Sequence, residues 1–121
     1  MQRPEHVHHR VGVTQGSRTV YLAGQVSWDT EGNLAGRDDV AAQAEKCSLN
    51  IAAGATAADL ATVTVYSVDL DEAKAEQFVI GRDRAAATLG VEFQQPSTWI
   101  EVASLAAPGY LVEVEAVAVL P

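Results

Sequence analysis

A chain of 121 residues is long enough to bury one hydrophobic core and too short for two, so we expect a single domain over residues 1–121. Its formal net charge of −8 repels phosphate backbones, which excludes nucleic acid as an expected partner. The sequence is 48% hydrophobic, yet no apolar run approaches the roughly 20 residues that a membrane span needs. With a single cysteine and no secretory leader, the composition predicts a cytoplasmic protein that does not enter a membrane.

The amino-terminal segment 1–10 is polar and contains Pro4, so we expect a loose lead-in there. His6, His8 and His9 are residue types that bind zinc. A loose arm lacks the outer contacts that orient metal ligands, and no metal site is expected.

The first strand is predicted at 18–28, which is rich in β-branched and aromatic residues. Gly32 and Asn33 follow as a turn signal. Together they predict a hairpin whose loop lies between Val26 and Leu34.

A helix is predicted over 38–54, with Asp38 or Asp39 as its amino-terminal cap and Gly54 as a left-handed end. Its apolar stripe is formed by Val40, Ala44, Cys47 and Ile51. The remaining predicted elements are a helical turn at 56–60, a strand at 61–70, a helix at 71–90 that Gly90 ends, and strands at 97–105 and 111–120. The order ββαβαββ predicts an α+β fold: one mixed sheet with both helices packed on one face.

The strand at 111–120 carries apolar residues on both faces. One face consists of Val112, Val114, Ala116, Ala118 and Leu120, and the other of Leu111, Glu113, Glu115, Val117 and Val119. Two helices cover only one face of the sheet, so the second face predicts a homo-oligomer. The alternative is that these valines are simply exposed, because folded surfaces are more than half apolar.

Three features of the sequence have a chemical and a structural interpretation. Glu113 and Glu115 share a strand face, where they would either hold a water or form an ion pair. Arg82 lies on the apolar stripe of the second helix and either points into a pocket for a carboxylate or extends along the helix surface. The chemical interpretation of Cys47 is a nucleophile, and the structural one is a buried, inert thiol. We expect the buried thiol, since helix stripes usually bury cysteine.

Three stretches, in order and with matching spacing, resemble the RidA (YjgF) family of enamine/imine deaminases: "VYLAGQVSWDTEGNLAG", "DDVAAQAEKCSLNIAAGATAADLATVTVYSVDL" and "PSTWIEVASLAAPGYLVEVEAVAVL". The resemblance covers residues 20–120. It implies a chorismate-mutase-like fold and a homotrimer whose sheets form a central barrel. It further implies small-molecule clefts between subunits and hydrolysis of 2-aminoacrylate-type enamines or imines without a cofactor.

By resemblance, Glu113 would position the attacking water. Residues that would contact the substrate are Ala23, Gly24, Gln25, Gly81, Thr98 and Ile100. Thr98 stands where the deaminases have an arginine that clamps the substrate carboxylate, and Arg82 or Arg10 would be its replacement. We therefore expect a deaminase of altered substrate preference, or alternatively a non-catalytic ligand-binding or interaction module that has lost deaminase activity.

Overall fold

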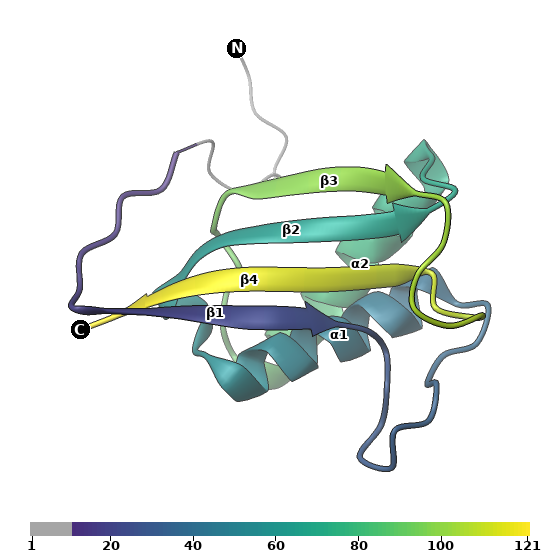
Figure 1. The fold of residues 1–121 in the computed structure, drawn as a ribbon, viewed down its shortest axis with the longest axis horizontal. Helices are drawn as coiled ribbons and strands as arrows, with labels where there is room; N and C mark the ends of the chain where they lie inside the picture. The colour runs from purple at the N-terminus through teal and green to yellow at the C-terminus, as the bar shows by residue number, and fades with distance from the viewer. Residues whose placement is uncertain (1–10) are drawn as a thin grey trace.

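The computed structural model describes residues 11–121, which form one sheet with helices packed against a single face (Figure 1). Within these residues the sheet has four strands in the order β1-β4-β2-β3. The elements are β1 (Arg18–Gln25), α1 (Val40–Gly54), a 3₁₀ turn (Ala57–Asp59), β2 (Leu60–Val68), α2 (Glu72–Leu89), β3 (Ser97–Val102) and β4 (Val112–Leu120). The predicted α+β class, with a mixed sheet and both helices on one face, is confirmed.

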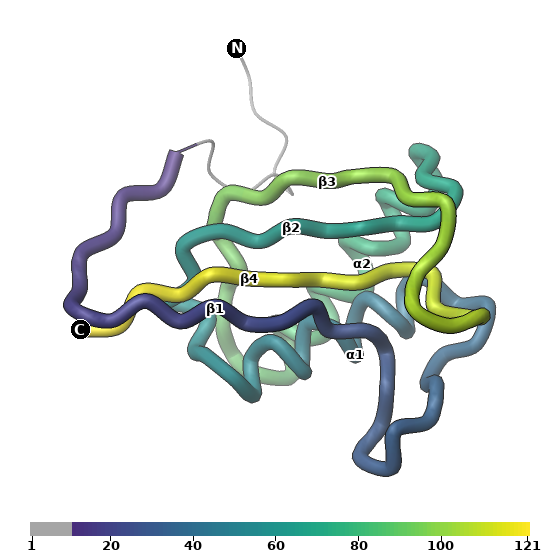
Figure 2. The backbone as a smooth tube through the Cα atoms, in the orientation of Figure 1, coloured from purple at the N-terminus to yellow at the C-terminus, as the bar shows by residue number. Residues whose placement is uncertain are grey.

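The last strand occupies the interior of the sheet. β4 pairs antiparallel with β1 on one side and with β2 on the other, while β2 and β3 run parallel. Figure 2 shows β1 and β4 side by side although they come from opposite ends of the chain. This arrangement leaves β1 and β3 as the edges.

The predicted second strand is reduced to a single bridge between Trp28 and Leu34. The carboxylate of Asp29 accepts hydrogen bonds from the backbone amides of Glu31, at 2.9 Å, and Asn33, at 3.0 Å. Amides bound in this way are not available for a strand ladder, so the segment closes into a compact loop.

Of the three helix ends for which the sequence predicted a cap, two are confirmed. Asp39 caps α1 by accepting from the amide of Ala42, and Asp71 caps α2. Gly90 ends α2 in the left-handed conformation with φ 68°. The prediction for Gly54 was wrong: it is the last helical residue, and the cap that follows it is extended. A side chain at Gly54 would lie 2.7 Å from Leu22 Cδ2, so the helix end packs closely on β1.

The core lies between the sheet and the helices. The predicted α1 stripe and the even-numbered residues 112–118 of β4 are buried in it. Gln43, fully buried, donates to the carbonyls of Gly36 (3.1 Å) and Gly109 (2.9 Å). The side-chain oxygen of Gln43 accepts a hydrogen bond from the backbone amide of Leu111 at 2.8 Å. Gln43 thereby holds Leu111, which immediately precedes β4 and lies two residues before Glu113.

The opposite side of the sheet, called the open face below, is covered by no element of the part of the chain that the structure describes (Figure 1). Its side chains are those of Thr19 and Tyr21 (β1), Glu113, Glu115, Val117 and Val119 (β4), Thr62, Thr64, Tyr66 and Val68 (β2), and Thr98, Ile100 and Val102 (β3). Tyr21 is 78% exposed and Ile100 41% exposed. Neither of the described helices is long and apolar enough to cross a membrane.

Candidate functional site

A β-bulge near the end of β1 shapes one side of the open face. Leu22 pairs with Ala116 and Gln25 with Val114, so two residues of β1, Ala23 and Gly24, stand opposite one residue of β4. The side chain of Gln25 donates to the carbonyl of Ala23 at 3.0 Å. Bulges of this kind release backbone groups from the ladder and often lie beside binding sites.

The carboxylate of Glu113 lies over this bulge. A Cβ atom placed on Gly24 would be 2.6 Å from Oε2 of Glu113 and 2.8 Å from its carboxyl carbon. Only glycine permits this approach. The fold therefore brings together Glu113 and Gly24, two of the residues that the resemblance assigns to the site.

Tyr66 connects the two glutamates of β4. It is paired in register with Glu113, yet its hydroxyl donates to Oε1 of Glu115 at 2.5 Å. This hydrogen bond, followed by partial burial and the negative charges of Glu115 and Glu113, raises the pKa of Tyr66 above its ordinary value. The sequence analysis missed Tyr66, because its strand alternation was visible but its register against β4 was not.

Thr98 and Ile100 also project from the open face, but β2 separates them from the glutamates. Thr98 pairs with Thr64, which in turn pairs with Glu115. Two strand spacings place the backbones of β3 and β4 about 10 Å apart. Within one chain, Thr98 and Glu113 are therefore not neighbours.

Gly81 and Arg82 do not lie with these residues. Gly81 is buried where α1 and α2 cross, and a Cβ there would be 2.0 Å from the carbonyl oxygen of Ala41. The glycine serves helix packing on the far side of the sheet, and nothing in this chain brings it to Glu113.

The pocket that Arg82 faces is also on the helix side of the sheet. Its lining includes Phe78, Gln95 and Trp99, and its volume of about 30 Å³ is too small for anything larger than water. Trp99 packs edge-on against Phe78, with ring centroids 5.1 Å apart, and so faces away from the open face. Arg10, the other predicted replacement for the clamp, lies outside the described residues, as do the three histidines.

Cys47 is buried, as expected for an inert thiol. Burial first, and then the negative charge of Glu113, raises its pKa to about 12. A thiol of this kind is not a nucleophile at neutral pH. Between residues 11 and 121 no group of three or more histidine, cysteine, aspartate or glutamate residues is arranged to hold a metal ion.

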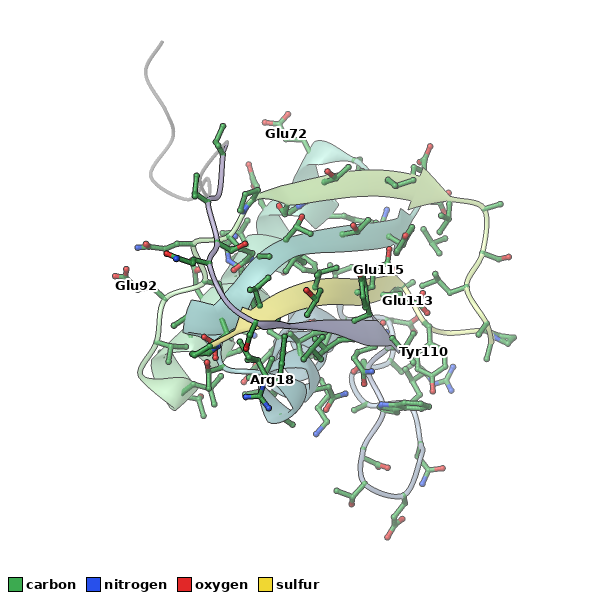
Figure 3. All side chains as sticks on the ribbon, turned by 60° about the vertical axis from the view of Figure 1, so that its left-hand side comes forward. Arg18, Glu72, Glu92, Tyr110, Glu113 and Glu115 are labelled. Atoms are coloured by element: carbon green, nitrogen blue, oxygen red, sulfur yellow. The ribbon has the colours of Figure 1, made fainter. Side chains whose placement is uncertain are left out.

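The charge of the open face is entirely negative among the described residues. It carries Glu113 and Glu115 and no lysine, arginine or histidine. Figure 3 shows the two glutamates next to each other near the start of β4, with Arg18 near the opposite end of the sheet. Such a surface offers acceptors for water and for cationic groups, and no cation that would bind a carboxylate.

Comparison with known proteins places this geometry in a family. A family model described as endoribonuclease L-PSP matches residues 1–120. The Rid-family protein YyfB of Yersinia pestis, described as of unknown function, is 34% identical with a TM-score of 0.74, over 91% of this chain and 85% of that one.

Two further solved structures agree. Rv2704 of Mycobacterium tuberculosis, a member of the YjgF/YER057c/UK114 family, is 28% identical with a TM-score of 0.63, over 90% of this chain and 84% of that one. The YjgF gene product of E. coli is 26% identical with a TM-score of 0.67, over 89% and 84% respectively. No curated protein matches the chain. The family model and these structures together show that the chain belongs to the Rid (YjgF) family.

Proposed function

We propose that this protein hydrolyses an imine or enamine to a carbonyl compound and ammonia, with Glu113 holding the water that attacks. The observation that carries the proposal is the position of the Glu113 carboxylate, which lies over the Gly24 bulge on a face that no described element covers. Family membership supports the reaction class, because the resemblance in the sequence implies an enamine/imine deaminase.

A complete site would need a second copy of the chain. A small imine is much shorter than the about 10 Å that separates β3 from β4. Thr98 of one copy would therefore meet Glu113 of another across a subunit interface. The half-exposed apolar residues of the open face, Ile100, Val117 and Val119, support such packing, and we propose the homotrimer that the resemblance implies.

The chemistry needs one base and one proton route. The water oxygen forms a bond to the imine carbon while Glu113 accepts a proton from that water. That proton passes to the nitrogen and gives a carbinolamine. Glu113 then takes the remaining hydroxyl proton and delivers it to the same nitrogen, the carbonyl forms as the carbon–nitrogen bond breaks, and neutral ammonia leaves. A positioned general base contributes about a hundredfold to ten-thousandfold to such a step.

The preferred substrate would be less acidic or larger than a small 2-imino acid. The hydroxyl of Thr98 supplies a neutral hydrogen bond, whereas an arginine supplies two charge-assisted bonds of roughly twice the strength each. The open face carries no cation among the described residues, and the net charge of the chain is −8. Both features disfavour a carboxylate ligand.

A second candidate function is ligand binding without catalysis, which the threonine at position 98 favours because it removes the carboxylate clamp. RNA cleavage, which the family model's description suggests, is not our proposal, since an acidic face repels RNA. We propose a cytoplasmic location on the basis of the single, buried cysteine.

Imines generated in situ separate the two candidates. An amino-acid oxidase would supply 2-imino acids, an amine oxidase would supply imines without a carboxylate, and loss of the semicarbazone would report hydrolysis. We expect the wild-type protein to accelerate hydrolysis, more strongly for imines without a carboxylate. Glu113→Gln should lower kcat at least about a hundredfold, because a glutamine cannot accept the proton of the water.

The matched control is Glu76→Gln, an exposed glutamate on α2, which should leave kcat unchanged. No acceleration by the wild-type protein across the panel would remove the hydrolase and leave the binding module. Full activity of Glu113→Gln would show that another group activates the water.

A further inference from the structure

Two glutamates on one strand face are chemically equal, but their surroundings on the open face are not. Glu113 and Glu115 both project from β4 toward the same side. No group within residues 11–121 donates a hydrogen bond to the side chain of Glu113, whereas Glu115 accepts one from the hydroxyl of Tyr66 at 2.5 Å. The difference between the two carboxylates is therefore made by one tyrosine.

The geometry of Tyr66 is diagonal. Residues directly opposite on paired strands have Cβ atoms about 5 Å apart, and diagonal neighbours are about 7–8 Å apart. Tyr66 stands directly opposite Glu113 but reaches the diagonal neighbour, Glu115. Its ring accordingly lies beside Glu113 while its single O–H donor is used on Glu115.

We infer that Tyr66 is a positioning residue of the site, which assigns different roles to the two glutamates. By donating to Glu115, it holds that carboxylate in place and leaves the Glu113 carboxylate as the acceptor for water. This inference rests on the proposed function and adds a residue to it.

The assignment matters for the path of the proton. Neighbouring carboxylates readily share one proton, because ionising both brings like charges together. A donated hydrogen bond favours the charged form of the carboxylate that accepts it. With Tyr66 bound to Glu115, the proton that Glu113 takes from water stays on Glu113 and is delivered to the departing nitrogen.

The first test measures the hydrogen bond without any substrate. The chain has three tyrosines, Tyr21, Tyr66 and Tyr110, and their ionisation is followed by ultraviolet absorbance. The titratable groups that face Tyr66 are Glu113 and Glu115 on β4, and its β3 neighbour is Ile100. We expect Tyr66 to ionise above its ordinary pH in the wild type and at a lower pH in Glu115→Gln. The Tyr66→Phe protein should lack this ionisation.

The second test measures catalysis with the best imine of the panel. Tyr66→Phe should lower kcat between about tenfold and a hundredfold with little change in KM, as expected when a reacting group is misplaced. Glu115→Gln, which keeps the tyrosine, should lower kcat similarly. The kcat of the double variant should be no lower than that of the less active single variant, because both substitutions remove the same hydrogen bond. In the wild type kcat should fall at the alkaline pH where Tyr66 ionises, because a tyrosinate cannot donate, and Tyr66→Phe should lack this fall.

Tyr21→Phe is the matched control, since Tyr21 shares the open face but has no hydrogen bond to either glutamate. It should leave kcat and the alkaline limb unchanged. An active wild type with an unaltered kcat and pH profile in Tyr66→Phe would overturn the positioning role and leave the proposed function intact. A wild type that accelerates no imine would overturn both, and the tyrosine titration would then show whether the bond itself forms.

Discussion

At the scale of single residues, Gly24 makes the position of Glu113 possible. A methyl group on Gly24 would lie 2.6 Å from Oε2 of Glu113, so Gly24→Ala should turn the glutamate away from the bulge. We expect kcat for imine hydrolysis to fall at least about tenfold, because the water would no longer be aligned. The free energy of unfolding should change by less than about 1 kcal/mol, since the displaced atoms are the flexible end of a half-buried side chain.

Gly54→Ala is the control for this variant. Its new methyl group would meet another flexible side chain, Leu22, at a similar distance of 2.7 Å, but no residue of the site. Kinetics and urea unfolding of both variants provide the comparison. Equal loss of kcat in the two variants would contradict a specific role for the Gly24 approach.

The sequence reached part of this residue-scale arrangement. The family resemblance grouped Glu113 with Gly24 and Gln25, and the structure places the carboxylate of Glu113 over the bulge that contains Gly24. Tyr66 was missed because its contact with Glu115 depends on the register of two strands that lie 49 positions apart in the chain. Neither composition nor local spacing contains that register.

At the scale of elements, the crossing of α1 and α2 depends on Gly81. A Cβ atom there would lie 2.0 Å from the backbone oxygen of Ala41 and 2.8 Å from Ala44 Cβ, and a backbone carbonyl cannot rotate away. Overpacking costs about 1–3 kcal/mol, and alanine regains about 1 kcal/mol of helix propensity. Because the clash is with backbone, the cost lies at the upper end of this range, and Gly81→Ala should destabilise the protein by about 2 kcal/mol in urea unfolding.

Thr88→Ala, an exposed position on the same helix, should leave stability within about 0.5 kcal/mol. A Gly81→Ala protein as stable as the wild type would mean that the helices do not approach this closely. Reduced kcat with unchanged stability would instead return Gly81 to the substrate site that the resemblance implied.

Helical periodicity and end signals were sufficient to predict both helices, because Asp39 and Gly90 are local signals. The hairpin after Val26 could not be excluded from the sequence. Its loss depends on the Asp29 side chain, which binds two amides that a second strand would have needed. Side-chain capture of this kind competes with strand formation and is decided by three-dimensional detail.

At the scale of the whole molecule, strand order limits what a sequence can tell about the site. β3 and β4 are consecutive in the chain, yet β2 lies between them in the sheet. Thr98 and Glu113 therefore lie on consecutive strands of the chain, but these two strands are not adjacent in the sheet. The pattern of valines on both faces of β4 predicted a covered second face, but the number of copies came only from the resemblance.

The proposed site exists only if open faces of several copies pack together, so the mass of the particle in solution is the most direct test. Light scattering of the purified protein at low and high concentration should report about 38 kDa, three times the 12.8 kDa of one chain. A particle of 12.8 kDa at both concentrations would leave Thr98 and Glu113 without a common site and would contradict the account.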